Sequence, residues 1–424
     1  MNVFCLPAAS LNRRAIVDTV LISLLERSPR PGVGVAGATF IDQVRRAGLM
    51  PAARAWDLLS IALSVTAADS SCSRATSADG WTREINLTVS VSEPDFWLTV
   101  IQDIEFILRF LTQDIWRIHF VAGPAMPAWD AAAPFEHDGA CLLSGGVDSL
   151  IGLTDLTNAG RRMIAVSQVA PGDKEHQREF VRAMGDGVAH VQLNHVVRPP
   201  GNAERSQRSR SFIFLAYGVL AASSTRRFEQ GEVVELFIPE NGFISLNAPL
   251  TPLRLGSLST RTTHPAYIQG FQRLLDKAGL HIRFVNPYQY KTKGEMMAEC
   301  RNQATLVRHA ASATSCGRFA RNAFRHCGRC VPCLVRRAAF LRWGMPDNTD
   351  YRYADLSIDD KDHRNFDDVR SMAMAAEKVR IDGVEQWAGS SLNALQLGDI
   401  EPYRAVLERS VAELRWLLSV HGVL

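Results

Sequence analysis

The feature that most constrains how this chain can fold is a short glycine-rich run, SGGVDS, in its middle third. The run comprises Ser144, Gly145, Gly146, Val147, Asp148 and Ser149. An apolar run precedes it and a helical pattern follows from Ser149, so it should join a strand to a helix. Adjacent glycines let the backbone turn sharply, and the N–H groups of such a turn and helix start point at phosphate oxygens. The sequence therefore predicts a phosphate-binding loop, in which Asp148 holds Mg²⁺ or positions the helix start.

Two other nucleotide-binding loops do not fit this run. A Walker A loop requires a lysine after its second glycine, and a dinucleotide fingerprint requires glycines at G-x-G-x-x-G spacing. The structural alternative is a glycine-rich turn capped by Asp148 and Ser149 without any ligand. The strand before the run and the helix after it favour phosphate binding over this alternative.

Downstream of Asp138 the apolar pattern alternates between strands and helices. Strands are predicted at 140–143, 163–169, 190–193, 233–238 and 282–285, and helices from 149 onward and at 174–184, 211–223 and 265–278. Strands that alternate with helices indicate a parallel sheet covered on both faces. We therefore predict an α/β domain with a parallel, doubly wound sheet over residues 135–345.

Two further segments flank this domain. Residues 1–134 combine predicted helices at 15–25, 52–67 and 96–111 with strands at 85–91 and 116–121, and they end in a Pro- and Ala-rich linker at 123–134. We predict an α+β accessory module there, which serves as a scaffold or docking domain. Residues 346–424 begin as an Asp-rich linker and continue with helical patterns, the last at 403–420. A helical C-terminal extension is therefore expected.

Four of the eight cysteines lie close together in the sequence: Cys316, Cys327, Cys330 and Cys333. C-x2-C turns present two thiolates on one side of a tight loop, and zinc prefers four soft ligands in a tetrahedron. Because four cysteines leave no open coordination position, we predict a structural zinc knuckle at 316–333. An iron–sulfur cluster also fits C-x2-C-x2-C, and unrelated buried thiols are a third interpretation, but zinc is favoured. His326 is expected to be a bystander.

The composition is that of an ordinary globular chain. It is 46% hydrophobic and 21% charged, with a net charge of +3 from 47 basic and 44 acidic residues. This balance argues against direct nucleic-acid binding. A phosphate-lined site or a solvated face accounts for the arginines at 301, 308, 318, 321 and 325. There is no leader and no apolar run long enough to span a bilayer, so a cytoplasmic protein without membrane contact is expected.

The phosphate loop and the cysteine knuckle, one near each end of the α/β domain, together resemble the QueC family of 7-cyano-7-deazaguanine synthases. These are ATP pyrophosphatases of the PP-loop class, and the resemblance covers roughly Asp138 to Trp343. It implies that the six loop residues bind ATP and that the four cysteines bind zinc. It also implies catalytic roles for Asp148, for Arg210 at the start of an apolar helix, and for Lys293 in a T-K segment.

In this family ATP activates a carboxylate that amines otherwise attack poorly. The resemblance implies that an oxygen of 7-carboxy-7-deazaguanine displaces pyrophosphate from the α phosphate, while Mg²⁺, the loop N–H groups and basic side chains stabilise the leaving group. Ammonia then attacks the adenylate, and a second activation dehydrates the amide to a nitrile. ATP, Mg²⁺ and Zn²⁺ are the implied cofactors, and a deazaguanine-type molecule is the implied substrate.

The chain departs from the family in its substrate loop, because the S-G-Y-P-D-C-R pattern is absent. Glu240 in its replacement is a candidate to bind a guanine-like edge, and Arg261 is a candidate to supply the missing guanidinium. The chain length and the S-T-R-T-T-H-P segment at 259–265 look like the QueC-like components of Qat anti-phage systems. That likeness implies a defence role, a protein partner, and transfer of the deazaguanine to an amine of that partner.

Two other functions stay open. A PP-loop tRNA-modifying enzyme also makes adenylates, although Cys141, just before the loop, is expected to pack in the core rather than to carry persulfide chemistry. A non-catalytic scaffold subunit would bind the nucleotide without turning it over. The presence of Asp148, Arg210 and Lys293 together argues for a catalyst over a scaffold.

Overall fold

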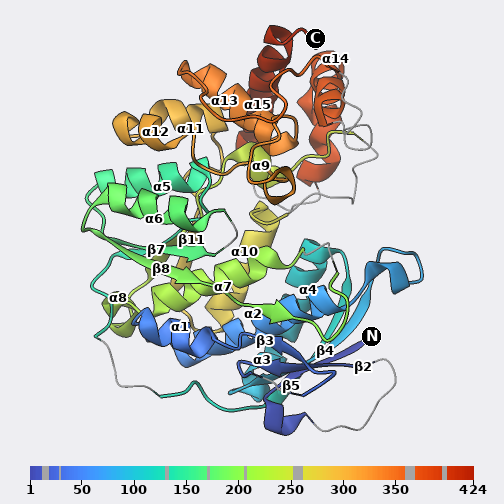
Figure 1. The fold of residues 1–424 in the computed structure, drawn as a ribbon, viewed down its shortest axis with the longest axis vertical. Helices are drawn as coiled ribbons and strands as arrows, with labels where there is room; N and C mark the ends of the chain where they lie inside the picture. The colour runs from blue at the N-terminus through green and yellow to red at the C-terminus, as the bar shows by residue number, and fades with distance from the viewer. Residues whose placement is uncertain are drawn as a thin grey trace.

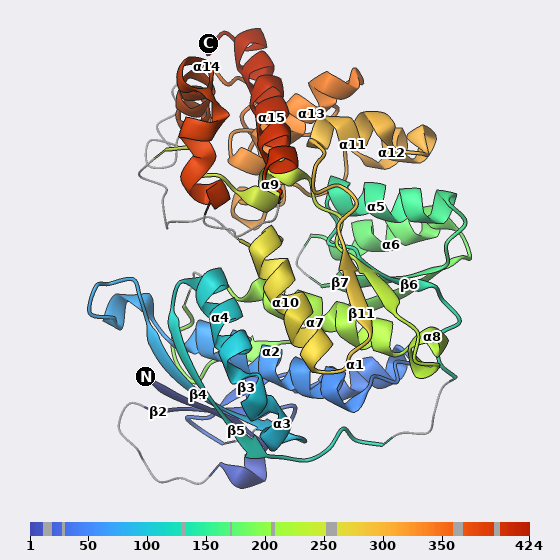
Figure 2. The same ribbon diagram turned by 180° about the vertical axis from the view of Figure 1, so that it is seen from behind.

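The structure, a computed structural model, describes residues 1–11, 19–27, 30–128, 133–169, 172–204, 208–251, 261–358, 368–393 and 399–424. The molecule is elongated, and its elements form three layers along the long axis (Figure 1). An N-terminal sheet lies at one end, a second sheet lies in the middle, and the C-terminal helices lie at the other end. The same three layers are seen from behind in Figure 2.

The middle layer is a five-stranded sheet in which every pair of neighbouring strands is parallel. Its strands are β6 (Gly139–Leu142), β7 (Met163–Gln168), β8 (Val188–Leu193), β10 (Val234–Phe237) and β11 (Ile282–Val285). They lie in the order β11-β10-β6-β7-β8. The strand order reverses direction between β6 and β10, and ligands of open α/β sheets bind outside the carboxyl ends of the strands at such a switch point.

Helices cover both faces of this central sheet. They are α5 (Val147–Asn158), α6 (Lys174–Met184), α7 (Arg210–Ser223) and α10 (Pro265–Lys277), with the short α8 (Arg226–Glu229) after α7. Alternate residues of β6 enter different cores: Ala140 and Leu142 pack with α7 and α10, whereas Cys141 and Leu143 pack with α5 and α6. The predicted parallel, doubly wound sheet is confirmed, and Cys141 is a core residue as expected.

The N-terminal layer is a second parallel sheet. Its strands are β1 (Asn2–Leu6), β2 (Thr19–Leu24), β3 (Gly34–Ala36), β4 (Glu84–Val91) and β5 (Ile115–Ala122), and β9 (Val197–Arg198) pairs antiparallel with β3 at one edge. Its helices are α1 (Phe40–Arg46), α2 (Ala53–Ser71), α3 (Pro94–Thr99) and α4 (Ile101–Thr112). The expectation of an α+β module is therefore wrong, because β1 to β5 pair only in parallel and helices connect β3 to β4 and β4 to β5.

The predicted helix at 15–25 is also wrong where the structure describes it. Residues 19–24 form β2, and Val20, Leu21 and Ile22 pair in parallel with β1. In a short apolar run the spacing cannot separate a buried strand from a buried helix, and the β-branched side chains here favour the strand. Residues 15–18 of that prediction lie outside the described residues, as do 129–132 of the predicted linker.

Helix α2 joins the two sheets. Its residues from Ala55 to Ser70 are all buried, so it has no solvent-exposed face over this stretch. It packs against β4 of the N-terminal sheet and against α7 of the central layer. A single hydrophobic core consequently runs through both layers, across the boundary predicted at residue 134.

The C-terminal layer is helical, as predicted. It contains α13 (Val331–Trp343), α14 (Asp368–Asn393) and α15 (Glu401–Val420). The remaining helices are α9 (Gly242–Leu246), α11 (Lys293–Glu299) and α12 (Gln303–His309). Side chains of α9, α13, α14 and α15 form a separate hydrophobic core. Among the helices of the described residues, none has the length and apolar character that crossing a membrane requires.

Candidate functional site

The SGGVDS run forms a tight loop between β6 and α5, as predicted. Gly145 has a φ of 97°, a conformation that favours glycine. A Cβ at Gly146 would lie 3.1 Å from the Thr314 carbonyl oxygen, so a side chain there would be crowded. The Oγ atoms of Ser144 and Ser149 lie 3.1 Å apart, and the Gly146 N–H donates to Ser144 Oγ at 3.3 Å. The loop thus places two hydroxyl groups and the start of α5 at one edge of the sheet.

Asp148 connects this loop to the next strand across the switch point. The backbone N–H and the side-chain Nδ2 of Asn241, the second residue after Pro239, donate to Asp148 Oδ2 at 3.1 and 2.7 Å. Asn241 also begins α9, because its Oδ1 accepts the N–H of Ile244 at 3.1 Å. The Asp148 carboxylate therefore links the segment that follows β6 to the segment that follows the neighbouring strand β10.

Lys293 binds the same carboxylate from a third segment. Its Nζ donates to Asp148 Oδ1, and its side chain is only 8% exposed. Lys293 is the first residue of α11, which begins with a capping box formed by Thr292 and Glu295. The structure therefore brings two of the three predicted catalytic residues into direct contact in a buried position.

Two neighbouring carboxyl groups at this site have opposite pKa shifts. Burial opposes ionisation of Asp148, but Lys293 and the hydrogen bonds outweigh it and hold its pKa below the usual range. Burial and the charge of Asp148 raise the pKa of Glu240 well above its ordinary value. Asn241 Nδ2 donates to Glu240 Oε1 at 3.1 Å. The site therefore combines an aspartate whose ionised form is favoured with a glutamate whose ionisation is opposed, a pattern typical of functional sites.

Arg210, the third predicted catalytic residue, lies on the other side of the phosphate loop. It begins α7 with an exposed side chain, and its Nε donates to Gln168 Oε1, at the end of β7, at 3.4 Å. Burial raises the pKa of the nearby Asp173, and the charge of Arg210 opposes that rise only in part. Asp173 lies next to the phosphate loop, because a Cβ added to Gly145 would be 3.5 Å from the Asp173 Cβ. Arg210 therefore lies near the loop on the side of β7.

The two predicted substrate-binding residues have different surroundings. Glu240 is part of the Asp148 group. Arg261 instead contacts α4: its guanidinium lies 4.8 Å from the centre of the Phe110 ring, and Nη1 donates to the Phe110 carbonyl oxygen at 3.4 Å. Residues 259–260 of the S-T-R-T-T-H-P segment lie outside the described residues. A substrate role for either residue stays a prediction.

Sequence reasoning missed two residues that complete the loop. Asn241 follows a buried strand directly, and the switch-point rule applied to the predicted strand order would have identified it. The Thr314 N–H donates to the Gly145 carbonyl oxygen at 2.9 Å, although the two residues are far apart in the sequence. No local pattern identifies Thr314, because its role depends on a long-range contact.

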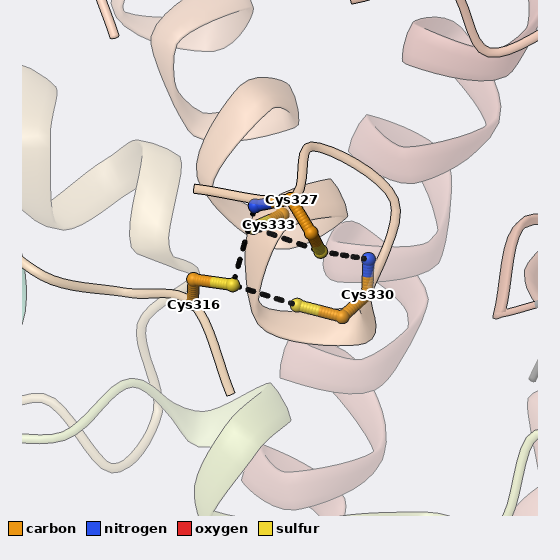
Figure 3. Close-up of side chains that lie close together, drawn as sticks. All are labelled: Cys316, Cys327, Cys330 and Cys333. Atoms are coloured by element: carbon orange, nitrogen blue, oxygen red, sulfur yellow. Dashed lines mark hydrogen bonds between the residues drawn. The ribbon is translucent and has the colours of Figure 1, made fainter. Parts of the chain in front are cut away.

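The four cysteines of the predicted knuckle come together as a compact buried cluster (Figure 3). All four sulfur atoms lie within 4.8 Å of one another, and the Cys327–Cys333 and Cys316–Cys330 sulfur pairs are 3.8 and 3.9 Å apart. A tetrahedron with metal–sulfur bonds of about 2.3 Å has sulfur–sulfur edges of about 3.8 Å. The cluster therefore fits a zinc site with four thiolate ligands.

The backbone around the cluster is arranged as thiolate ligands require. Backbone N–H groups of Arg318 and Cys327 each donate to Cys316 Sγ at 3.3 Å, which stabilises negative charge on the sulfur. Gly328 has a φ of 84°, and a Cβ there would lie 2.3 Å from a carbonyl oxygen, so the turn requires glycine. His326 Nε2 accepts the N–H of Ser315 at 3.2 Å, which is consistent with the bystander role expected of it.

The cysteine cluster is coupled to the phosphate loop through residues 310–315. Arg336, which is fully buried on α13, donates to the carbonyl oxygen of Ala313 at 2.9 Å and to the Oγ of Ser315 at 3.2 Å. Thr314, between those two residues, is the one whose N–H binds Gly145. The helix that begins at the cluster therefore holds the segment against which the loop rests.

Part of the chain is similar in sequence to curated 7-cyano-7-deazaguanine synthases. It is 34% identical over 95 residues to the enzyme of that name from Paracoccus denitrificans, and 36% identical over 95 residues to 7-cyano-7-deazaguanine synthase 1 of Mesorhizobium japonicum. Each match spans 22% of this chain and 38% of the relative's length. No protein-family model and no solved structure matches the chain. The partial matches support a relationship to the QueC family.

Proposed function

We propose that this chain is an ATP-dependent enzyme that adenylates the carboxylate of a 7-deazaguanine. The observation that carries the proposal is the meeting of Asp148, Asn241 and Lys293 at the switch point beside a glycine-rich loop. This is where open parallel sheets bind nucleotides. The partial similarity to 7-cyano-7-deazaguanine synthases supports the choice of substrate class.

In the proposed reaction, an oxygen of the substrate carboxylate attacks the α phosphorus of ATP, and the bond to the β phosphate breaks to release pyrophosphate. The N–H groups at the start of α5 and the hydroxyls of Ser144 and Ser149 would bind the phosphates. Lys293 and Arg210 approach from opposite sides and would stabilise the charge on the leaving pyrophosphate. Asp148 pairs with Lys293 and orients it in its buried position.

Glu240 is proposed to bind the base of the substrate. A protonated carboxyl group both donates and accepts a hydrogen bond, so it can pair with the edge of a guanine-like ring. Burial and the charge of Asp148 both favour that form of Glu240, because both raise its pKa. Arg261 would act on the substrate only if its segment moved away from Phe110, so it is the weaker of the two predicted substrate contacts.

The proposed metals are Mg²⁺ and Zn²⁺. Mg²⁺ bound to ATP neutralises phosphate charge, and it usually takes few protein carboxylates because the phosphates supply the other ligands. Asp148 and Glu240 offer oxygen ligands of the required kind, but both oxygens of Asp148 already accept hydrogen bonds. Cys316, Cys327, Cys330 and Cys333 would hold Zn²⁺ as a structural ion.

We also propose which product forms and in which biological system the chain acts. With ammonia as the nucleophile the product would be 7-cyano-7-deazaguanine, and with an amine of a partner protein it would be a deazaguanine conjugate. The second outcome would suit a component of an anti-phage defence system of the Qat type, and the N- and C-terminal layers would offer surfaces for the partner. A phosphate-binding role, rather than nucleic-acid binding, is proposed for the arginines near the loop.

The test is to incubate the protein with ATP, Mg²⁺ and 7-carboxy-7-deazaguanine, with and without ammonia, and to follow products by mass spectrometry. AMP and a nitrile that both depend on ammonia would establish synthase chemistry. Consumption of ATP to AMP without a nitrile would favour a protein acceptor. If neither an adenylate nor AMP forms with this substrate, the deazaguanine proposal is wrong.

A further inference from the structure

The C-terminal helix α15 contacts the segment that presents Lys293. Tyr403 donates through its hydroxyl to Gln289 Oε1 at 3.1 Å, and Arg409 Nη2 donates to the Tyr290 carbonyl oxygen at 2.7 Å. These contacts join the C-terminal extension to residues just before α11. In Figure 1 the red α15 lies beside α13 and close to α11, at the end of the molecule far from the N-terminal sheet.

Helix α15 binds both members of the capping box that starts α11. Thr292 Oγ1 donates to Glu413 Oε1 at 2.6 Å, and Arg409 Nε donates to Glu295 Oε1 at 2.6 Å. Arg409 and Glu413 are four residues apart, so they project from the same face of α15. A single helix face therefore holds the two side chains that define where α11 begins.

The Thr292 hydroxyl forms two hydrogen bonds, one as acceptor and one as donor. Its oxygen accepts the N–H of Glu295 at 3.0 Å, so its single proton is available for only one acceptor, and Glu413 is that acceptor. Gly294 adds to the close fit, because a Cβ there would lie 2.8 Å from Glu413 Oε2. Lys293, between these two residues, consequently has a fixed backbone position.

We propose that Glu413 and Arg409 are positioning residues, through which the C-terminal extension holds Lys293 against Asp148 for catalysis. The inference rests on the proposed function for its kinetic consequence, since Lys293 is assigned there to the leaving pyrophosphate. It gives the extension a role inside the active site. A loosened capping box would let the Lys293 ammonium drift, and misplacement of a catalytic group by about 1 Å can cost about 100-fold in rate.

The kinetic test compares pyrophosphate release by Glu413→Ala, Glu413→Gln and Arg409→Ala with the parent. Glu413→Ala should lower kcat by about tenfold or more while KM for ATP changes far less, because Lys293 acts mainly on the developing charge. Glu413→Gln should recover most of the loss, since an amide oxygen still accepts from Thr292. Arg409→Ala should lower kcat by less than Glu413→Ala does, because Thr292 keeps its acceptor.

Glu408→Ala and Arg415→Ala are matched controls. Both residues lie on α15 with exposed side chains, and neither contacts the segment 289–295 in the structure. Each control should keep the parent's kcat. The proposal is overturned if Glu413→Ala behaves like Glu408→Ala, or if Glu413→Gln is as damaging as Glu413→Ala.

A second measurement does not depend on the substrate. The rate at which an amine-reactive reagent modifies Lys293, measured by mass spectrometry against exposed Lys378, should rise several-fold in Glu413→Ala and stay unchanged in Glu408→Ala. Absence of pyrophosphate release by the parent would contradict the proposed function, but the Lys293 modification rate would still test the positioning. Equal rates in Glu413→Ala and Glu408→Ala would overturn the positioning role.

Discussion

The two parallel sheets of this chain both bury charged side chains, but they use them differently. In the N-terminal layer Arg83 binds Asp69 and Asp114, and Arg74 binds Asp114 as well, so these charges satisfy one another. In the central layer Asp148 pairs with Lys293, and Glu240, whose pKa is raised by burial and by the charge of Asp148, lies beside them at the carboxyl edge of the sheet.

The difference shows that a parallel sheet does not by itself make a site. The N-terminal charges lie within the fold and connect α2 to the strand ends, so removing them should affect stability. The central charges lie beside a loop whose conformation requires glycine and whose hydroxyls face the sheet edge. Removing those should affect the reaction. Each prediction below tests this separation of roles.

The largest effect is expected from removing the Zn²⁺ that we propose the four cysteines hold. Structural zinc contributes about 10–16 kcal/mol to the folding of small thiolate sites, so a strong chelator or Cys327→Ser should unfold the knuckle. Because Arg336 and Thr314 link the knuckle to Gly145, hydrogen exchange should rise in the phosphate loop and stay low in β1 and β4. Replacement of Cys72, a buried cysteine of the N-terminal layer, by Ala is the control and should leave exchange in the loop unchanged.

Asp114→Asn should destabilise the protein without changing catalysis. Breaking a buried ion pair by removing one partner costs about 3–5 kcal/mol, and in this variant Arg74 would remain buried without its anion while Arg83 would keep only Asp69. Urea unfolding would measure the loss, and kcat per folded molecule should match the parent. The exposed pair of Arg117 and Glu84 gives the control, since Glu84→Gln should cost less than about 1 kcal/mol. A large fall in kcat for Asp114→Asn would contradict the separation.

Asp148→Asn should lower kcat per folded molecule strongly, beyond any loss of stability from breaking its ion pair with Lys293. Loss of the charge that orients Lys293 should lower pyrophosphate release by about 100-fold or more, in the range seen when a transition-state contact is lost. Asp155→Asn is a matched control on the same helix, because Asp155 accepts the Tyr288 hydroxyl at 2.7 Å outside the Asp148 group. Equal activity of the two variants would exclude a catalytic role for Asp148.

The smallest effect concerns pH at the junction of the two layers. Burial, together with the charge of Arg261, lowers the pKa of His264 to about 3, and its Nδ1 accepts the Ala266 N–H at the start of α10. Because the pKa of His264 is lower in the folded protein than in the unfolded chain, protonation favours the unfolded chain. The contribution of neutral His264 to stability is therefore present above about pH 6.5 and is lost as the pH falls. Unfolding free energy should drop by up to about 2 kcal/mol between pH 6.5 and 5. His264→Asn, which keeps a capping group but does not titrate, should reduce that slope in urea titrations.

Local patterns predicted most of the central layer from the sequence. The helix at Lys174–Met184 and the strand at Ile282–Val285 have the predicted bounds, because each has a clear apolar period and turn residues at its ends. The N-terminal layer was predicted less well. Strands β1 and β3 were not predicted, and β2 has an apolar run that also fits a helix, so pairing with neighbouring strands identifies them.

The sequence by itself determined the residues whose chemistry is local. The glycines of the phosphate loop and the C-x2-C turns of the knuckle specify their own backbone geometry, so their roles can be deduced from spacing. Tertiary structure decided what those residues contact. Asn241, Thr314 and Glu413 reach the site from segments far apart in the chain, and such contacts depend on strand order and helix packing. No local pattern encodes them, because the free energy that selects them comes from burial of the whole fold.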